Sequence, residues 1–250
     1  MRILVYGAGV LGCNLARDFF KAGKDVTLLA RGKWAETIKT NGLCIKNYVL
    51  SVKSTVRVPV VSELASEDEY DVIFVAARYT QVATILDAMR ANKSKNVVFL
   101  GNNVQPEKLV TALPEKNVMF AFASFVLPVA FACYKTDGDL KRLKGDTTYF
   151  NKMADANVEG YRALKNSGHA ILPKDDEEFE GEKYRKTCVK FFTLMCATGL
   201  GKVCASDHAM NAIEEMSTLN RDLKKLFEEN GVAYPVWKEM EKDAEKYLQK

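Results

Sequence analysis

One run of glycines constrains the fold of this chain more than any other feature. Gly7-Ala8-Gly9-Val10-Leu11-Gly12 follows a short apolar stretch, Arg2 to Tyr6, and opens a helical pattern, Leu11 to Ala22. In this context G-x-G-x-x-G predicts a strand, a tight turn and a helix whose N-terminus faces an anion. The first glycine permits the turn, the second lets backbone approach the ligand, and the third lets helix and strand pack closely. The motif predicts a dinucleotide site with its pyrophosphate against Gly7, Ala8, Gly9, Val10, Leu11 and Gly12, although a purely structural glycine turn has the same sequence.

Short apolar runs alternate with helical patterns through the rest of the first hundred residues. Further strands are predicted at Asp25 to Ala30, Asp71 to Ala77 and Asn96 to Gly101, and further helices at Gln81 to Ala91, with Thr80 as its cap, and Pro106 to Leu113. Runs this apolar are typical of strands that are buried on both faces. The pattern predicts an α/β fold: a Rossmann-like, mostly parallel sheet covered by helices on both faces.

The pattern changes after residue 117. Three further strands are predicted at Val118 to Leu127, Val129 to Tyr134 and Thr147 to Asn151, followed by a helix at Ala154 to Ser167 and a strand at His169 to Leu172. These segments are expected to extend the sheet. From Asp175 onward only helical patterns remain, at Glu177 to Ala197, Asp207 to Asn230 and Pro235 to Gln249. The sequence therefore predicts a sheet domain over residues 1–173 and a small all-helical domain over residues 174–250.

Charge is divided unevenly between these two parts. Residues 1–173 carry 23 lysines and arginines against 16 aspartates and glutamates, a net charge of +7, whereas residues 174–250 carry 13 against 16, a net charge of −3. A modest positive excess suits a small polyanion such as a dinucleotide. Nucleic acid would require clustered basic residues interleaved with aromatics, and no such stripe is present, so we expect no nucleic-acid partner.

The cysteines and the apolar segments argue for a cytoplasmic protein. Six cysteines without a C-x-x-C pair, in a chain with only two histidines, indicate reduced thiols packed as small hydrophobes and no metal site. Residues Val118 to Tyr134 carry no charge over seventeen positions, which is fewer than the roughly 20 residues that span a bilayer, and Pro128 divides this stretch. We therefore expect no membrane-spanning segment.

The end of the second predicted strand bears on cofactor choice. An NAD site carries an Asp or Glu there for the ribose diol, but this chain has Leu28-Leu29-Ala30-Arg31. Ala30 removes the group that would repel a 2′-phosphate, and the planar guanidinium of Arg31 is able to bind one. Arg78, after the strand Asp71 to Ala77, supplies a second positive charge at the same sheet edge. The sequence favours NADP(H) over NAD(H); an ordinary surface arginine at position 31 is the alternative.

These residues form a recognisable set. Gly7 to Gly12, Ala30-Arg31-Gly32, Asn41-Gly42-Leu43, Val75 to Arg78 with Gln81, and Gly101-Asn102-Asn103 with Glu107 resemble the ketopantoate reductase (2-dehydropantoate 2-reductase) family, NADPH-dependent oxidoreductases of pantothenate biosynthesis. The resemblance implies that Arg31 and Arg78 hold the 2′-phosphate, that Gln81 lies nearby, and that Asn102 sits beside the nicotinamide.

The resemblance also implies a catalytic helix. The family's aromatic-Arg-Lys triplet has its counterpart in Tyr184-Arg185-Lys186, so Lys186 is the candidate general acid for reduction of a carbonyl. The two asparagines that follow in the family are replaced by Lys190 and Leu194. Lys190 offers a cation for a substrate carboxylate, and a small-molecule 2-oxo acid, reduced to a 2-hydroxy acid, is the expected substrate. The alternative is a solvated helix, in which Glu182 and Lys186 form an ordinary ion pair.

The helical domain predicted over residues 174–250 is short for the family. Its shortening is expected to expose apolar positions such as Phe191, Leu194 and Met195, which predicts a homodimer. A different class of function also remains open, namely a non-catalytic NADP(H)-binding sensor or interaction protein that has lost the substrate site.

Overall fold

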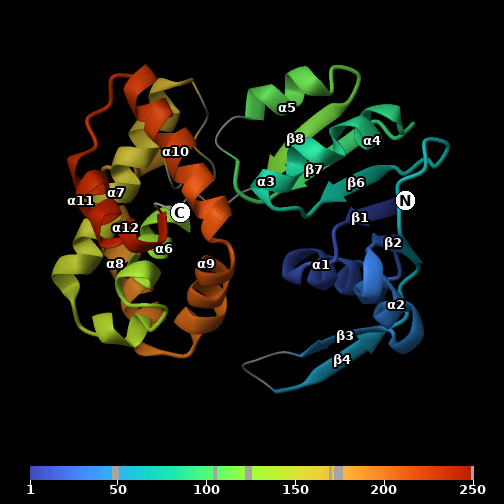
Figure 1. Cartoon of the computed structure of the whole chain (residues 1–250), viewed down its shortest axis with the longest axis horizontal. Helices are drawn as coiled ribbons and strands as arrows, with labels where there is room; N and C mark the ends of the chain where they lie inside the picture. Colours follow the sequence, from blue (N-terminus) through green and yellow to red (C-terminus); the bar gives the residue numbers. More distant parts are fainter. Residues whose placement is uncertain (47–50, 104–105, 122–125, 169–170, 172–176, 249–250) are drawn as a thin grey trace. The chain divides into compact units, whose positions relative to one another are not determined.

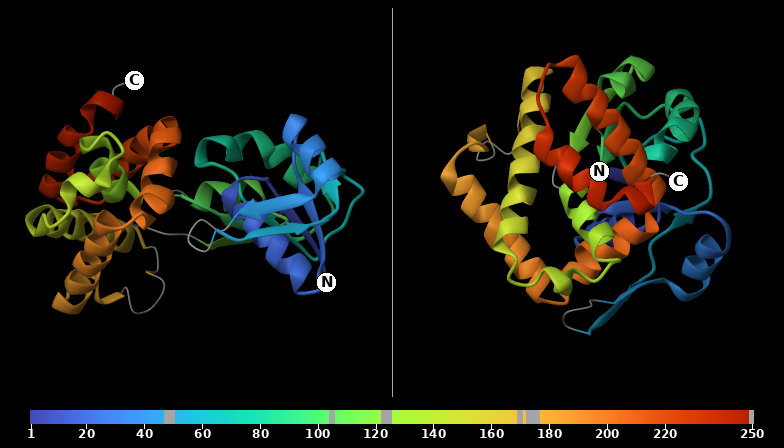
Figure 2. Two further views of the ribbon diagram at one scale, coloured as in Figure 1. Left: turned by 90° about the horizontal axis from the view of Figure 1, so that it is seen from below. Right: turned by 60° about the vertical axis from the view of Figure 1, so that its left-hand side comes forward.

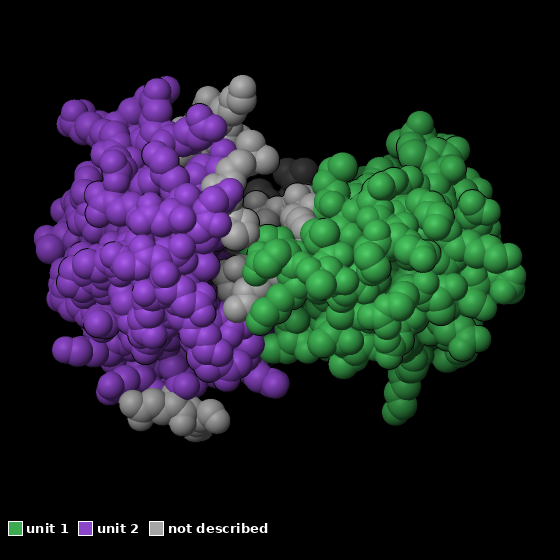
Figure 3. Space-filling view, turned by 90° about the horizontal axis from the view of Figure 1, so that it is seen from above, with its two compact units in different colours: residues 1–122 green, residues 123–250 purple. Residues whose placement is uncertain are grey.

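The fold is described from a computed structural model, which covers residues 1–46, 51–103, 106–121, 126–168, 171 and 177–248. The chain divides into a first unit, Met1–Phe122, and a second unit, Ala123–Lys250 (Figures 1 and 3).

A six-stranded parallel sheet forms the centre of the first unit. Its strands are ordered β5-β2-β1-β6-β7-β8. They span Val60–Val61 (β5), Asp25–Leu29 (β2), Arg2–Tyr6 (β1), Val72–Val75 (β6), Asn96–Leu100 (β7) and Asn117–Ala121 (β8). The chain builds outward from β1 to β5 and then crosses to β6 on the other side of β1. The fold predicted from the sequence is confirmed, and the crevice between the carboxyl ends of β1 and β6 is where such sheets bind ligands.

Alternating residues of the strands pack into two cores. Ile3 and Val5 of β1 face helices α1 (Val10–Lys21) and α2 (Gly32–Asn41), while Leu4 and Tyr6 face the side that α4 (Leu86–Ala91) and α5 (Pro106–Ala112) cover. Both faces of the sheet are therefore buried, which explains why the strands are apolar without alternation. A hairpin of β3 (Leu43–Lys46) and β4 (Lys53–Val56) forms a separate two-stranded sheet.

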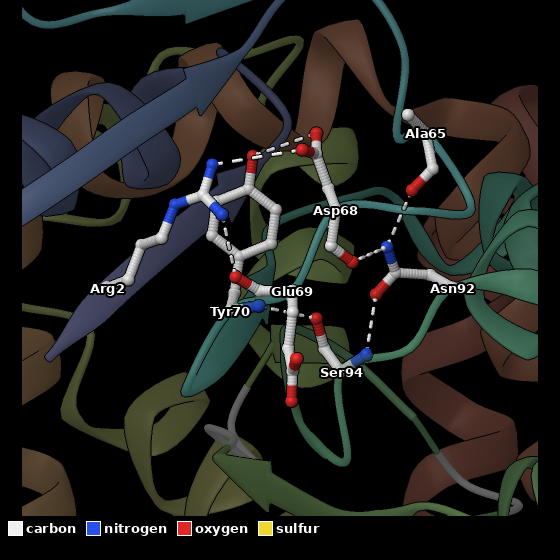
Figure 4. Close-up of polar contacts among 7 residues, drawn as sticks. All are labelled: Arg2, Ala65, Asp68, Glu69, Tyr70, Asn92 and Ser94. Atoms are coloured by element: carbon white, nitrogen blue, oxygen red, sulfur yellow. Dashed lines mark hydrogen bonds and ion pairs between the residues drawn. The ribbon is translucent and has the colours of Figure 1, made fainter.

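Loops at the amino end of the sheet are held by a buried polar network (Figure 4). Asn92, which is 2% exposed, donates from Nδ2 to the carbonyls of Ala65 and Asp68 at 2.7 and 2.8 Å, and its Oδ1 accepts the N–H of Ser94 at 2.9 Å. The Ser94 hydroxyl accepts the N–H of Tyr70 at 2.8 Å. The network fixes the entry to β6.

The described part of the second unit is helical (Figure 2). Its α-helices are α6 (Val126–Lys135), α7 (Thr147–Asn166), α8 (Glu182–Ala197), α9 (Asp207–Asn211), α10 (Ile213–Glu229), α11 (Pro235–Asp243) and α12 (Glu245–Leu248). Trp237 packs edge-on against Phe131 and Phe227, each at 5.4 Å between ring centroids. The buried Glu159 carboxylate accepts the N–H groups of Val236 and Trp237 at 3.0 and 2.8 Å, so it caps the start of α11.

Two segments predicted as strands are helices. Residues 129–134 lie in α6, where Pro128 occupies the first turn and most side chains are buried. Residues 147–151 form the start of α7, which Asp146 caps by accepting the N–H of Tyr149 at 2.9 Å. A helix that is buried on all sides is apolar throughout, as a central strand is. The composition of α6 is therefore the same as that of a buried strand, and the sequence pattern did not distinguish the two. Residues 169–170 and 172 of the strand predicted at 169–172 lie outside the described residues.

The boundary between the units also differs from the predicted one. The contacts divide the chain after Phe122, about fifty residues before the boundary predicted at residue 173. The reason is that α6 and α7 do not extend the sheet: α7 packs against α8, α10 and α11, and α6 packs against α7, α10 and α11.

All six cysteines are free. Cys13, Cys133, Cys188 and Cys196 are buried, as expected for thiols that pack as small hydrophobes, whereas Cys44 and Cys204 are exposed. Within the described ranges, no three His, Cys, Asp or Glu side chains are grouped to hold a metal. No single described helix is long and apolar enough to cross a membrane. Helix α8 and the helical segment Lys202–Asn211 reach the required length and apolar composition only when taken together, and the chain bends by 100° between them.

Candidate cofactor-binding site

The glycine motif forms a tight turn between β1 and α1. Gly7 has φ +110°, and a Cβ there would lie 2.4 Å from the Ala76 carbonyl oxygen. A Cβ on Gly12 would lie 1.9 Å from the Gly7 carbonyl oxygen. Neither position therefore accepts a side chain. A Cβ on Gly9 would meet nothing within 4 Å, so the turn is open at this glycine and leaves space for a ligand.

Helix α1 presents an uncapped N-terminus at this turn. Gly9 is the N-cap residue, no side chain caps the helix, and the first turn contains no acidic residue. Val10 and Leu11 in this turn are exposed. The backbone N–H groups of the first turn, together with the helix dipole, make this end suitable for an anion such as a pyrophosphate.

Two side chains hold the Ala8 carbonyl inside the turn. The indole Nε1 of Trp34 donates to the Ala8 oxygen at 2.9 Å, and the Cys13 thiol donates to it at 3.2 Å. Burial raises the pKa of the Cys13 thiol, which keeps it protonated and able to donate. The conformation of the turn is thus fixed by residues of both α1 and α2.

A pocket of about 340 Å³ opens beside the turn at the carboxyl ends of β1, β2 and β6. Its lining residues are Tyr6, Gly7, Ala8, Gly9, Leu29, Ala30, Arg31, Trp34, Ala76, Ala77, Arg78, Gln81, Thr84 and Ile85. Two arginines and no carboxylate are found in this lining, as far as the described residues go. The pocket therefore favours an anionic ligand.

The two arginines come from different strand ends. Arg31 follows β2, and its guanidinium donates from Nη2 to the Tyr6 hydroxyl while lying 5.5 Å from the centre of the Tyr6 ring. Arg78 follows β6 and precedes the short helix α3 (Tyr79–Val82). The Arg78 N–H donates to the Gln81 side chain at 3.4 Å. The structure thus brings together the glycine turn, Arg31, Arg78 and Gln81, which the sequence predicted as one site.

Asn102 occupies a different place. It follows β7 after Gly101, whose φ is +137°, and is half-buried at the carboxyl edge of the sheet, one strand beyond β6. It is not among the residues that line the pocket. Its position beside a nicotinamide remains a prediction.

Lys186 and Lys190 belong to α8 of the second unit. The Lys186 side chain is 67% exposed and pairs with the Glu182 carboxylate at 2.8 Å, one helical turn away. Lys190 is also exposed. In the predicted triplet, Tyr184 is buried and Arg185 pairs with Asp155. The ion pair expected for a solvated helix is present, and the roles of Lys186 in catalysis and Lys190 in substrate binding remain predictions.

The exposed apolar face predicted on α8 is present in part. Phe191 and Leu194 are exposed, whereas Met195 is buried in the second unit, contrary to the expectation. Met195 points inward because it shares its helix face with the buried Cys188 and Phe192. Homodimer formation remains a prediction that light scattering tests.

The second unit has a larger groove, of about 1390 Å³, along α10, α11 and α12. Both acidic and basic side chains line it, and Lys224 pairs there with Glu241 at 3.0 Å. Because these opposite charges largely neutralise one another, the groove favours neither an anionic nor a cationic ligand. The smaller pocket is therefore the better site, because its positive charge, open glycine turn and uncapped helix all favour an anion.

Tyr6 and Trp34 are functional candidates that the sequence analysis missed. Tyr6 stands directly before the glycine motif, and Trp34 lies one helical turn beyond Arg31. The only sequence signal of a functional role was that each lies close in the chain to predicted cofactor-binding residues. It was weak, because an aromatic residue at either place is equally compatible with the core.

Parallel strands, the glycine turn at the switch point and the two strand-end arginines define a dinucleotide-binding protein of the Rossmann type. Residues 3–129 match the family described as ketopantoate reductase PanE/ApbA, and the chain belongs to that family. It is also 28% identical over 122 residues to "Uncharacterized oxidoreductase YkpB" of Bacillus subtilis (strain 168). That alignment covers 48% of this chain and only 39% of the length of the relative.

Solved structures share the fold along nearly the whole chain. A D-mandelate dehydrogenase in complex with NADH and anilino(oxo)acetate is similar with a TM-score of 0.74 and 14% identity, covering 100% of this chain and 98% of that one. The 2-dehydropantoate 2-reductase of Geobacter metallireducens GS-15 gives a TM-score of 0.69 and 13% identity, covering 98% and 99%. At these identities the similarity concerns the fold.

Proposed function

We propose that this protein is an NADPH-dependent oxidoreductase that reduces a 2-oxo acid to a 2-hydroxy acid. The observation that carries the proposal is the pocket at the carboxyl ends of β1, β2 and β6, where an open glycine turn adjoins two arginines without a carboxylate in the described lining. Membership in a reductase family supports an oxidoreductase activity.

The residues of the pocket fit the parts of NADPH. The N-terminus of α1 and the turn at Gly9 suit the pyrophosphate, because both present backbone to an open space. Arg31 and Arg78 suit the 2′-phosphate, with Gln81 nearby. Asn102 is the candidate neighbour of the nicotinamide, which supplies a hydride when the cofactor is bound.

The choice of NADPH depends on this chain's own residues. One structural neighbour was solved with NADH, so fold similarity does not decide between the two cofactors. Ala30 stands directly after β2, where an NAD site has a carboxylate, and Arg31 follows it. A permanently charged fork in this place favours the cofactor that carries the additional phosphate.

The proposed substrate class is supported by the family and by one neighbour, whose structure contains anilino(oxo)acetate. In the proposed reaction the Lys186 ammonium protonates the carbonyl oxygen, and Lys190 pairs with the substrate carboxylate. The ion pair of Lys186 with Glu182 favours a second candidate function, in which the protein binds NADP(H) without catalysis.

Titrations of Arg31→Ala with NADPH and NADH test the cofactor. We expect NADPH to bind about 10- to 100-fold more weakly and NADH to change less than about twofold, because only NADPH carries the phosphate that Arg31 contacts. Arg57→Ala is the matched control, since Arg57 is exposed and lies outside the pocket lining. An equal loss for both cofactors would contradict the phosphate-binding role.

Turnover separates the two candidate functions. NADPH oxidation is followed with 2-dehydropantoate, benzoylformate, pyruvate and 2-oxoisovalerate, comparing the wild type with Lys186→Ala. We expect the wild type to consume at least one substrate and kcat to fall about 100-fold or more in the variant, as for loss of a general acid. Lys183→Ala, an exposed lysine of the same helix, is the control. Oxidation that survives Lys186→Ala would exclude Lys186, and no oxidation despite tight NADPH binding would favour the non-catalytic function.

A further inference from the structure

Tyr6 connects the core of the sheet with the charged edge of the pocket. It is the last residue of β1, directly before Gly7, and is 5% exposed because it packs in the core with Leu29 and Val75. Its hydroxyl accepts the hydrogen bond from Arg31, and the guanidinium lies above its ring. A rigid side chain of the central strand thus contacts the flexible side chain that follows the neighbouring strand.

We infer that Tyr6 is a positioning residue that sets the preference for a 2′-phosphorylated cofactor by holding Arg31 in place. This inference rests on the proposed NADPH function and adds to it a residue that determines specificity. A free arginine samples many rotamers, and binding a phosphate requires it to adopt one. An arginine that the tyrosine already orders loses less conformational freedom when the ligand arrives.

The hydrogen bond to Tyr6 leaves most of the guanidinium available. Arginine has five N–H donors, and Tyr6 occupies one of them. A bidentate contact with a phosphate uses two, so the grip on the ligand and the bond to Tyr6 are compatible.

The same arrangement distinguishes a specificity role from a structural one. Tyr6 acts on Arg31, and Arg31 acts on the 2′-phosphate, so removal of the hydroxyl should affect NADPH and spare NADH. A tyrosine that served only the core would affect the two cofactors equally, because the pyrophosphate turn and the adenosine are common to both.

The chain contains a matched control for this substitution. Tyr70 is buried in the same core as Tyr6 and also lies beneath an arginine, with the Arg2 guanidinium 4.5 Å from its ring centre (Figure 4). Tyr70 precedes β6, at the amino end of the sheet, whereas Tyr6 ends β1 at the carboxyl end. Tyr70→Phe therefore removes a hydroxyl from a comparable environment at the end of the sheet away from the pocket.

The experiment measures the Kd values of NADPH, NADH, 2′,5′-ADP and 5′-AMP for the full chain and its variants. For Tyr6→Phe we expect the Kd of NADPH and of 2′,5′-ADP to rise about 5- to 20-fold, while NADH and 5′-AMP change less than about twofold. Tyr70→Phe should leave all four ligands unchanged. In the Arg31→Ala background, Tyr6→Phe should have no further effect on NADPH, because the side chain that it positions is gone.

The outcomes separate the inference from the function on which it rests. If Arg31→Ala does not discriminate between NADPH and NADH, the proposed cofactor is wrong. If Arg31→Ala discriminates and Tyr6→Phe does not, the role of Tyr6 is wrong. Equal weakening of all four ligands in Tyr6→Phe, or an additive effect of the two substitutions, would likewise overturn it.

Discussion

At the scale of single residues, Trp34 and Tyr6 support different parts of the pocket. Trp34 donates to the Ala8 carbonyl at 2.9 Å, while Tyr6 contacts Arg31. The Ala8–Gly9 peptide is planar, so a fixed Ala8 carbonyl also fixes the direction of the Gly9 N–H on the other side of the peptide. Trp34 therefore orders the part of the site that suits the pyrophosphate.

The substitution Trp34→Phe keeps an aromatic ring and removes the indole donor. We expect NADPH and NADH to bind about 3- to 10-fold more weakly and to the same degree, because both contain the pyrophosphate. Titration of both cofactors checks this, with the thermal midpoint of the variant as the control for folding. A loss confined to NADPH would instead assign Trp34 to the 2′-phosphate.

At the scale of elements, the network around Asn92 holds the loops at the amino end of the sheet (Figure 4). Asn92 makes three hydrogen bonds to backbone groups, two through Nδ2 and one through Oδ1. Lys116, which precedes β8, adds a bond to the Ser94 carbonyl at 2.8 Å, and desolvation lowers its pKa. The network joins segments that precede β6, β7 and β8 and lies at the sheet end remote from the pocket.

Removal of the Asn92 amide should destabilise the first unit without altering the ligand site. For Asn92→Ala we expect the free energy of unfolding to fall by about 2–4 kcal/mol, because the buried Ser94 N–H and the carbonyls of Ala65 and Asp68 lose their hydrogen-bond partner. Urea unfolding measures the change, and NADPH titration of the folded variant should give an unchanged Kd. Asn96→Ala is the control: this exposed side chain donates to the Asp71 carbonyl at 2.8 Å, and its loss should cost less than about 1 kcal/mol. A similar loss of unfolding free energy in both variants would show that burial does not determine how much these hydrogen bonds contribute to stability.

The sequence predicted the elements of the first unit better than those around residue 130. Gly7, Arg31 and Arg78 stand just after strand ends, and parallel strands bring their ends to one edge, so chain position alone predicted their meeting. Residues 126–135 lack such a constraint, because a short apolar run has the same composition in a central strand and in a buried helix. The contacts of Tyr6 and Trp34 depend on side-chain directions between neighbouring elements, which periodicity does not encode.

At the scale of the whole molecule, the division after Phe122 places α6 and α7 with the helices that follow them. The two cores of the first unit are built from residues that precede Phe122. All residues that line the pocket also lie before it, the first being Tyr6 and the last Ile85. The buried side of α7, which includes Phe150, Met153 and Ala156, belongs to the second unit and packs against α8, α10 and α11. A fragment that ends at residue 173 therefore keeps α6 and α7 but lacks the helices that cover them.

Two fragments test this division. We expect residues 1–122 to unfold cooperatively, to elute as a monomer and to bind NADPH with the Kd of the full chain, because the sheet cores and the pocket are complete. We expect residues 1–173 to aggregate, since Phe150, Met153 and their neighbours would lose their packing partners and form an exposed apolar surface. Size exclusion with light scattering and thermal unfolding of both fragments provide the measurement. A monomeric 1–173 fragment that melts above 1–122 would show instead that α6 and α7 stabilise the sheet, and the boundary would then lie near residue 173.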